Sequence, residues 1–287
     1  MKISVIVRSR NDAGMIADTM TRLFAQKLPA GCEAEIINID NNSSDGTAGI
    51  VREMNPVGQV VEWREKYVPG RVLNAGVALA TGEIVVFHNS DCTPQGDGYL
   101  AALVAPLLAK QADLVFGNQL PRADARPLVV KDYRRAFGDG REAATWRHMF
   151  SLVSSAASRE LLLAEPFDES LQYSEDIEWS YRLRRKGCRI VYVPEAKSIH
   201  SHNYTLAETW KRFFNEGVAD AAIFDEKPRF FRGFFFTLGR EYMRDLRFLA
   251  VNGYWAAMPR ELFWRLVQRF AHYRGLCAAE RQTSVGS

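Results

Sequence analysis

Two hydrophobic periodicities alternate over the first half of the chain. Short apolar runs, rich in β-branched residues, indicate strands at Ile3–Val7, Ala34–Ile39, Val60–Trp63, Glu83–Phe87 and Leu114–Phe116. Between them, helical spacing of apolar residues indicates helices at Asp12–Gln26, Thr47–Met54, Val72–Ala80 and Tyr99–Lys110. Runs that are apolar throughout are typical of strands buried on both faces. Because strands and helices alternate, the pattern predicts an α/β fold with a doubly wound, mostly parallel sheet.

The second half of the chain contains one sharply bounded helix and a helical extension. Residues 118–150 lose the alternation, which predicts an extended or partly helical excursion. A regular helical pattern resumes at Tyr173–Lys186, where we expect Ser174 to cap a helix with acidic residues in its first turn. A strand at Arg189–Val193 follows, and from Leu206 onward the pattern is only helical. We therefore expect a sheet domain over residues 1–205 and a helical extension over residues 206–287.

Composition and charge exclude several classes of protein. The chain has 287 residues, is 47% hydrophobic and carries a net charge of +3, which gives no basic field for nucleic acid. The four cysteines form no CxxC pair, so reduced thiols and a cytoplasmic location are expected. Neither a signal peptide nor a membrane-spanning run is expected, because no apolar stretch approaches the required length of about 20 residues.

The basic charge is concentrated at the end of the chain. Residues 227–287 carry 11 basic and 4 acidic side chains, whereas residues 1–226 carry 26 and 30. Aromatic residues are interleaved with these arginines, from Phe230 to Arg274. Cationic and aromatic faces on helices predict contact with an anionic membrane surface, hence a peripheral location on the inner face of the cytoplasmic membrane. The alternatives are a helical cap on the sheet domain and a homodimer interface.

Polar runs follow three of the predicted strands. They extend over residues 8–12, residues 40–47 and residues 88–94. Ligands of open α/β sheets bind in the crevice outside the carboxyl ends of the strands. The three runs are therefore expected to line one crevice.

Several residues of these runs are candidates for binding a nucleotide and a cation. Asp40 is placed to accept hydrogen bonds from a base or ribose, and Asp91, at the end of a buried strand, could bind Mg²⁺ or Mn²⁺. The alternative for Asp91 is an Asx-type turn before Pro94. Arg71 could neutralise a diphosphate, or it could be a solvated surface side chain.

A second group of candidates lies in the second half of the chain. Asp176, beside Glu175, could act as a general base near a sugar ring, with Trp179 one turn further along the helix. Acids in a first turn are explained equally well by the helix dipole. His200 and His202 follow the next strand, and their alternation indicates that only one of them would be a ligand of the cation bound by Asp91.

These blocks together resemble family 2 glycosyltransferases of the GT-A fold over residues 1–205. The supporting text is SVIVRSRND, IDNNSSDGT, GRVLNAGVALATGEIVVFHNSDCTP, SEDIEWSYRLRRKG and VPEAKSIHSH, in that order. The combination of DNNSSDGT, GRVLNAG and HSHNYTLAETWKRFFNEG looks most like the rhamnosyltransferase-type branch. One residue departs from the family pattern, because Asn89 stands where the DXD motif has its first acid. That departure puts metal affinity in doubt.

The resemblance implies a role for each matching residue. Asp176 of the ED pair, with Glu175, would be the catalytic base, and Asp91 with His200 or His202 would bind Mg²⁺ or Mn²⁺. The residues implied to bind the nucleotide sugar are Ser9, Arg10, Asn11, Asp40, Asn42, Arg71, Asn74, Ser90 and Trp179.

The implied activity is inverting transfer of a sugar, rhamnose in this branch, from a dTDP- or UDP-linked donor. The acceptor would be a glycan or a lipid-linked molecule in cell-surface polysaccharide synthesis. Three alternatives are weaker. A nicotinamide dehydrogenase has only Gly138-Asp139-Gly140 as a fingerprint, and that segment follows no strand. A sugar nucleotidyltransferase lacks its glycine-rich basic loop, and a non-catalytic membrane adaptor would need neither Asp91 nor the Glu175–Asp176 pair.

Overall fold

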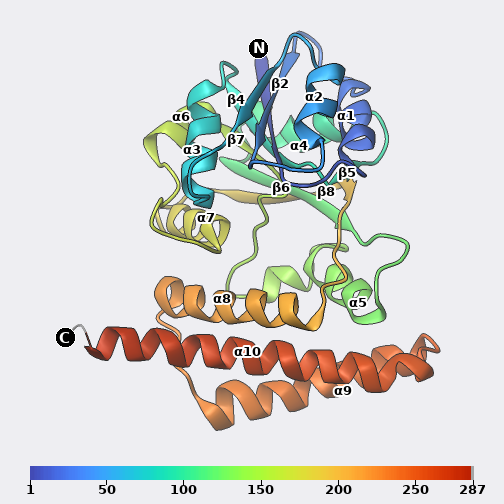
Figure 1. The fold of residues 1–287 in the computed structure, drawn as a ribbon, viewed down its shortest axis with the longest axis vertical. Helices are drawn as coiled ribbons and strands as arrows, with labels where there is room; N and C mark the ends of the chain where they lie inside the picture. The colour runs from blue at the N-terminus through green and yellow to red at the C-terminus, as the bar shows by residue number, and fades with distance from the viewer. Residues whose placement is uncertain (286–287) are drawn as a thin grey trace. The chain divides into compact units, whose positions relative to one another are not determined.

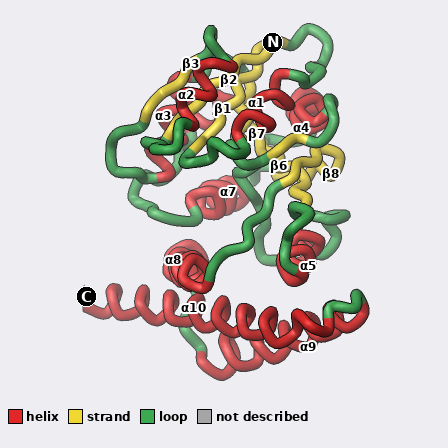
Figure 2. Tube along the Cα trace, turned by 45° about the vertical axis from the view of Figure 1, so that its right-hand side comes forward, coloured by secondary structure: helices red, strands yellow, loops and turns green. Residues whose placement is uncertain are grey.

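The computed structural model describes residues 1–285, and the chain divides into two compact units. The first unit comprises residues 1–122 and 133–200, and the second comprises residues 123–132 and the chain from residue 201 onward. Strands and helices alternate in the first unit, and the second is helical (Figures 1 and 2). The predicted α/β fold, with a mostly parallel sheet and helices at the C-terminus, is confirmed.

The sheet of the first unit has eight strands in the order β3-β2-β1-β4-β7-β6-β8-β5. The pairs β1–β2, β1–β4, β2–β3 and β6–β8 are parallel, whereas β7 is antiparallel to β4 and β6, and β5 is antiparallel to β8. The strands are β1 (Lys2–Ser9), β2 (Glu33–Asp40), β3 (Gln59–Glu62), β4 (Ile84–Asn89), β5 (Thr93–Pro94), β6 (Leu114–Leu120), β7 (Ser154–Ser158) and β8 (Ile190–Ile199).

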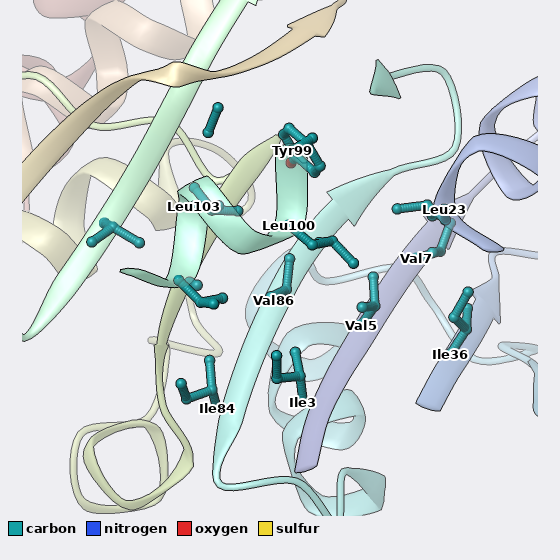
Figure 3. Close-up of a cluster of buried hydrophobic side chains, with 14 of the residues drawn as sticks. Ile3, Val5, Val7, Leu23, Ile36, Ile84, Val86, Tyr99, Leu100 and Leu103 are labelled. Carbon is teal, nitrogen blue, oxygen red and sulfur yellow. The ribbon is translucent and has the colours of Figure 1, made fainter. Parts of the chain in front are cut away.

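Helices cover both faces of this sheet. They are α1 (Ile16–Phe24), α2 (Thr47–Met54), α3 (Pro69–Leu79), α4 (Tyr99–Leu108), the short 3₁₀ helix η1 (Ala143–Thr145), α6 (Arg159–Ala164) and α7 (Glu175–Arg185). One buried cluster joins β1 and β4 to α1, α2 and α4, and Figure 3 shows Leu100 and Leu103 of α4 above these strands. A second cluster joins the opposite face of the sheet to α3, α6 and α7.

The continuous apolar run of β1 results from burial on both faces. Ile3, Val5 and Val7 lie in the first cluster and Ile6 lies in the second, and all four are completely buried. Each such side chain contributes about 1.5–3 kcal/mol by leaving water. A strand in this position therefore shows no alternation of apolar and polar residues.

The register between β6 and β8 changes once. Gly117 pairs with Val193, but the next residue, Asn118, pairs with Lys197, so three residues of β8 bulge outward. A Cβ atom on Gly117 would lie 2.6 Å from Ser154 Oγ and 2.7 Å from the carbonyl oxygen of Ala196. Only glycine fits at this point without a shift of the neighbouring backbone.

Besides the start of α5 (Pro127–Ala136), the second unit contains α8 (Leu206–Phe224), the π-helical turn η2 (Phe230–Phe235), α9 (Phe236–Val251), the 3₁₀ helix η3 (Trp255–Ala257) and α10 (Met258–Val285). The predicted helical character from Leu206 onward is confirmed. A capping box of Thr205 and Glu208 begins α8. Among residues 1–285, none of the helices combines the length and the hydropathy needed to cross a bilayer.

A buried ion network joins three helices of the second unit. Asp245 of α9 is fully buried and pairs with Lys131 of α5 (Pro127–Ala136), the helix in which the boundary between the units falls. Arg265 of α10 donates from Nε to Asp245 Oδ2 at 2.8 Å and also pairs with Asp132 at 2.8 Å. Buried charges are tolerated because each has a partner of opposite sign.

Several local expectations differ from the structure. The excursion at residues 118–150 contains the end of β6 and the helix α5, and the strand β7 follows it without a sequence signal. Ser174 precedes α7, as expected, but its side chain accepts no capping hydrogen bond, and its backbone is left-handed, with φ of 59°. The predicted cap is therefore wrong, because a capping side chain reaches the first turn from an extended backbone rather than from a left-handed one.

Candidate active site

The polar strand ends meet at one edge of the sheet, as predicted. In the parallel register, Ser9 of β1 lies opposite Asp40 of β2, and Arg8 lies opposite Asn89 of β4. The three polar runs therefore begin side by side at the carboxyl ends of neighbouring strands. This is the position in which open α/β sheets bind their ligands.

Asp40 organises the loops that follow β1 and β2. Its carboxylate is buried and accepts hydrogen bonds from Ser9 Oγ at 3.0 Å, from Ser43 Oγ at 2.6 Å and from the backbone N–H of Ser43 at 2.8 Å. Asn11 and Asn42 have left-handed backbones, with φ of 54° and 51°. These loops are held in a fixed conformation, as a preformed nucleotide site requires.

The other candidates of this loop region differ in exposure. Arg10 and Asn42 are exposed, and the backbone N–H of Asn11 donates to Ser43 Oγ at 2.9 Å. Ser90 is buried and donates to Asp12. The first and third polar runs are thus tied together by hydrogen bonds.

Glu175, the neighbour of Asp176 in the chain, pairs with an arginine that the sequence reasoning did not select. Arg8 donates from Nη1 to Glu175 Oε1 at 3.3 Å and from Nη2 to Asn89 Oδ1 at 3.1 Å. Burial, followed by the charge of Glu175, raises the pKa of Asp176 to about 6, against the effect of nearby Arg8. A carboxyl group with a pKa near neutrality is suited to accept a proton in a reaction.

Asp91 and His200 form a convergent pair at the ends of β4 and β8. His200 Nε2 lies 3.6 Å from Asp91 Oδ2, and the two side chains are 7% and 9% exposed. Arg122 lies on the other side of Asp91, with its Nη2 at 3.7 Å from the same oxygen. A carboxylate and an imidazole that point at one location form a donor set suited to Mn²⁺ or Mg²⁺.

His202 lies in the second unit, two residues beyond His200. Its ring is stacked on Tyr204, with 5.1 Å between the ring centroids. Consecutive Cα atoms are about 3.8 Å apart, so the chain alone keeps His202 near His200.

Two candidates are used by the fold itself, and a third lies at the surface. Trp179 is 1% exposed, lies in the cluster under α7 and donates from Nε1 to the carbonyl oxygen of Glu165 at 2.7 Å. Its indole cannot stack on a sugar, which corrects the expectation for this residue. The amide of Asn74 is held by Phe167 and Glu169, so it anchors the loop after α6 rather than facing a ligand. Arg71 is exposed and pairs with Glu169 at 3.5 Å.

Three residues near the candidate site were missed by sequence reasoning. Arg8 opens the first polar run, which was a usable signal. Gln119 and Arg122 lie in and just after β6, within the segment where the alternation is lost. Nothing in the local sequence connects them to Asp91 or His200, because the contacts join strands far apart in the chain.

The fold and the cluster of acids, arginine and histidine define a glycosyltransferase of the GT-A kind. The family model described as "Glycosyl transferase family 2" matches residues 4–161. The chain therefore belongs to glycosyltransferase family 2, and it is an enzyme of that family.

Relatives in sequence agree with the predicted branch. The chain is 29% identical over 201 residues to the O-antigen chain rhamnosyltransferase WbaN of Salmonella anatum, covering 66% of this chain and 63% of that protein. It is 26% identical over 237 residues to the O-antigen chain rhamnosyltransferase RfbN of Salmonella typhimurium, covering 77% and 73%. The chain thus spans a little less than two thirds of the first of these relatives. The predicted rhamnosyltransferase-type branch is confirmed.

Solved structures share the fold. The mannosyltransferase PcManGT of Pyrobaculum calidifontis, in complex with GDP-Man and Mn²⁺, matches with a TM-score of 0.62 at 22% identity, covering 99% of this chain and 79% of that one. Glucosyl-3-phosphoglycerate synthase of Mycobacterium tuberculosis, in complex with Mn²⁺, UDP and phosphoglyceric acid, matches with a TM-score of 0.55 at 26% identity, covering 72% of each chain.

Proposed function

We propose that this enzyme transfers a sugar, with inversion, from a nucleoside diphosphate donor to a hydroxyl group of a glycan or lipid-linked acceptor. The observation that carries the proposal is the position of Asp176. Its carboxyl group has a pKa of about 6, and its neighbour Glu175 pairs with Arg8, which in turn contacts Asn89 at the end of β4. A base is thus present beside the strand edge where a donor would bind.

The donor would occupy the loops after β1 and β2. Asp40, held by Ser9, would face the base or ribose together with Arg10, Asn11 and Asn42. The base would be uracil or thymine, in line with the UDP named for one structural neighbour and with the dTDP- or UDP-linked donor expected from the sequence resemblance. Ser90 and Arg71 would lie toward the diphosphate.

Asp91 and His200 would hold Mg²⁺ or Mn²⁺, and His202 is a candidate third ligand because of its place in the chain. Asn89 lacks the charge of an acid, so Asp91 is the single carboxylate of its motif. A bound divalent cation stabilises negative charge that develops on the diphosphate leaving group. Arg122, beside Asp91, supplies positive charge from the protein itself.

The reaction would proceed in one displacement. Asp176 accepts the proton of the acceptor hydroxyl, and the acceptor oxygen forms a bond to the anomeric carbon. The bond between that carbon and the phosphate oxygen breaks, and its electron pair leaves with the nucleoside diphosphate. Because attack comes from the face opposite the leaving group, the configuration at the anomeric carbon is inverted. Glu175 would assist by its charge and by its contact with Arg8.

The sugar and the acceptor are inferred from the relatives. Two sequence relatives are named as O-antigen chain rhamnosyltransferases. We infer that the transferred sugar is rhamnose and that the product is part of a cell-surface polysaccharide. Growing chains of this kind are carried on lipids, so the enzyme would work in the cytoplasm at the inner face of the membrane.

An exposed stripe on α9 supports contact with an anionic bilayer. Phe236, Met243 and Val251 are 67%, 69% and 78% exposed, and the exposed Arg240 and Arg247 alternate with them. The spacing of three or four residues places all five on one face of the helix. We call this face the α9 stripe. Apolar side chains between arginines suit the boundary between headgroups and acyl chains, with about 1 kcal/mol from each arginine near an anionic surface.

The membrane contact has its own test. The full-length protein should float with vesicles that contain phosphatidylglycerol and stay at the bottom with vesicles of phosphatidylcholine alone. Serine at Phe236, Met243 and Val251 together should abolish flotation. The control is Val57→Ser, which changes an apolar residue that is 98% exposed in the first unit. If the triple variant floats like the wild type, the α9 stripe is not the contact surface.

The activity is tested by a panel of nucleotide sugars. With Mn²⁺ present, we expect slow hydrolysis of a dTDP- or UDP-linked sugar and protection against thermal unfolding by the matching nucleoside diphosphate. A sugar nucleotidyltransferase would instead release pyrophosphate from a nucleoside triphosphate and a sugar 1-phosphate. A non-catalytic adaptor would do neither. Failure of every donor in both assays would refute the proposed activity.

A further inference from the structure

Arg8 occupies the centre of the candidate site without a role in the proposed reaction. It is the second-last residue of β1, and its side chain is 17% exposed. One arm of the guanidinium donates to Glu175 of α7 and the other to Asn89 of β4. Arg8 and Glu175 are 167 residues apart in the chain. This arginine therefore connects the donor edge of the sheet to the helix that carries the proposed base.

Asn89 explains why this connection is possible. Its side-chain oxygen accepts a single hydrogen bond from Arg8 at 3.1 Å and carries no charge. An aspartate at this position would compete with Glu175 for the same guanidinium, because a carboxylate is the stronger acceptor. With asparagine, the ion pair of Arg8 is directed to Glu175 alone.

The start of α7 needs such an anchor. Ser174 makes no capping hydrogen bond, so the first turn of the helix is not fixed by its N-cap. The carboxylate of Asp176 is held by the backbone N–H of Ile177 at 2.9 Å and more weakly by that of Leu152 at 3.4 Å. The ion pair between Arg8 and Glu175 is the side-chain contact that ties this turn to the sheet.

We propose that Arg8 is a positioning residue that holds Glu175, and through it the first turn of α7, so that Asp176 faces the acceptor. Its positive charge also favours the ionised form of Asp176. The inference rests on the proposed role of Asp176 as the base. On this inference, Asn89 contributes to the site, because its uncharged side chain leaves the ion pair of Arg8 to Glu175.

The charges around Asp176 come from few elements. Glu175 precedes it on α7, and Arg8 faces it from β1, while Tyr67 contributes to the electrostatic environment of Arg8. His148 donates to or accepts from Ser180 Oγ at 2.8 Å, one turn further along α7, and burial lowers the pKa of this histidine to about 4. His148 is therefore neutral in the working range, and Arg8 is the cation that acts on Asp176.

The test compares Arg8→Met with Arg8→Lys in the full-length enzyme. We expect Arg8→Met to lower kcat about tenfold or more while the KM for the donor changes less than about threefold. The acid limb of the profile of kcat/KM against pH should move upward by about one unit, since a neighbouring cation favours the ionised carboxylate. Arg8→Lys keeps the charge but loses the two-armed contact, so its acid limb should stay in place while kcat falls.

Two controls make the outcome decisive. Arg22→Met removes an exposed arginine of α1 that pairs with Asp18, and it should leave both the rate and the pH profile unchanged. In a Glu175→Gln background, Arg8→Met should have a much smaller effect, because the two residues act as a pair. An unshifted pH profile for Arg8→Met, or effects that simply add, would overturn the inference. If Asp176→Asn retains full transfer, the proposed base itself fails, which is a different result.

Discussion

Gln119 Oε1 lies 2.9 Å from Nδ1 of His200, while Gln119 Nε2 donates to Ser151 Oγ at 2.7 Å. In this orientation the amide oxygen faces the histidine, and the hydroxyl of Tyr133 lies 3.2 Å from the same Nδ1. Nδ1 therefore carries the proton and donates to Gln119, and the lone pair of Nε2 points toward Asp91. An acceptor nitrogen facing a carboxylate is unfavourable unless a cation lies between them, which supports the proposed metal site.

Replacing this glutamine should weaken metal binding without removing a ligand. We expect Gln119→Leu to reduce the affinity for Mn²⁺ about 10–100-fold, because the histidine ring is no longer held in the ligating tautomer. Titration of free Mn²⁺ by electron paramagnetic resonance measures this directly. Gln111→Leu, at an exposed position just after α4, is the matched control. Equal affinity in both variants would show that Gln119 does not orient the ligand.

Removal of the metal should distinguish the two histidines. Treatment with EDTA is expected to abolish transfer, and added Mn²⁺ to restore it. His200→Ala should raise the Mn²⁺ concentration needed for half-maximal activity more than His202→Ala does, because Gln119 holds His200 in the ligating tautomer, whereas the ring of His202 is stacked on Tyr204. His272→Gln, which alters the pair with Asp220 in the second unit, serves as the control. A stronger effect of His202→Ala would reverse the assignment of ligands.

The base should be visible in both the rate and the pH dependence. Asp176→Asn is expected to lower kcat by about 10²–10⁴-fold while donor binding and the melting temperature change little. The wild-type rate should rise with pH through the pKa of about 6, because the raised pKa keeps Asp176 protonated below it. A rate that is flat from pH 5 to pH 8 would contradict this role.

A carboxylate at the opposite end of the sheet should make stability depend on pH. Burial alone would raise the pKa of Glu35, but hydrogen bonds from Lys2, Ser4 and Thr81 outweigh it and lower this pKa to about 2. In the unfolded chain the pKa of a glutamate is near 4.3. Because the folded pKa is lower, Glu35 stabilises the fold above about pH 4.3, and this contribution is lost as the pH falls toward 2.

Glu35→Gln should therefore reduce the free energy of unfolding by about 1–2 kcal/mol at pH 7, and by progressively less below pH 4. Urea unfolding at several pH values measures the difference. Glu33→Gln, exposed on the same strand, should show no such trend. A constant deficit for Glu35→Gln at all pH values would argue against an ionised carboxylate as its cause.

The ion network of the second unit should be sensitive to loss of its central charge. Asp245→Asn leaves Lys131 and Arg265 with too little negative charge in a buried setting, and we expect a cost of about 3–5 kcal/mol. Tryptophan fluorescence during urea unfolding measures the difference, and three of the six tryptophans, Trp210, Trp255 and Trp264, lie in this unit. Asp225→Asn is the control, because that carboxylate is 84% exposed. Equal stability of the two variants would mean that the network adds little to the fold.

The sequence predicted those parts of the fold that depend on local pattern. The buried run of β1 and the polar residues that follow it could be recognised because strand burial and strand ends leave distinct signals. β7 could not, since its sequence SSAAS is short, and its small side chains are selected by close packing between β4 and β6. Such a strand has no hydrophobic run to detect.

The candidate site was predictable only where residue types follow strand ends or form a family motif. Asp40, Asp91 and Asp176 met one of those conditions. Arg8 and Gln119 act through partners more than 80 residues away, so no local pattern contains their roles. The expectation that Trp179 contacts the donor was wrong for a different reason. Its position on the same helical face as Asp176 does not tell whether that face meets solvent or the core, and the structure buries it.

The bulge between Gly117 and Asn118 determines which face of β8 the histidine occupies. Residues 194–196 carry β8 past this point, so that Ile199, its last residue, lies opposite Leu120 and His200 follows directly. Removing or inserting one residue in this segment would exchange the two faces of the strand beyond it and turn His200 away from Asp91. Exposed Glu195 can vary in kind, but the number of residues between Val193 and Lys197 cannot. Length polymorphism in this segment should therefore separate enzymes that keep this metal site from those that have lost it.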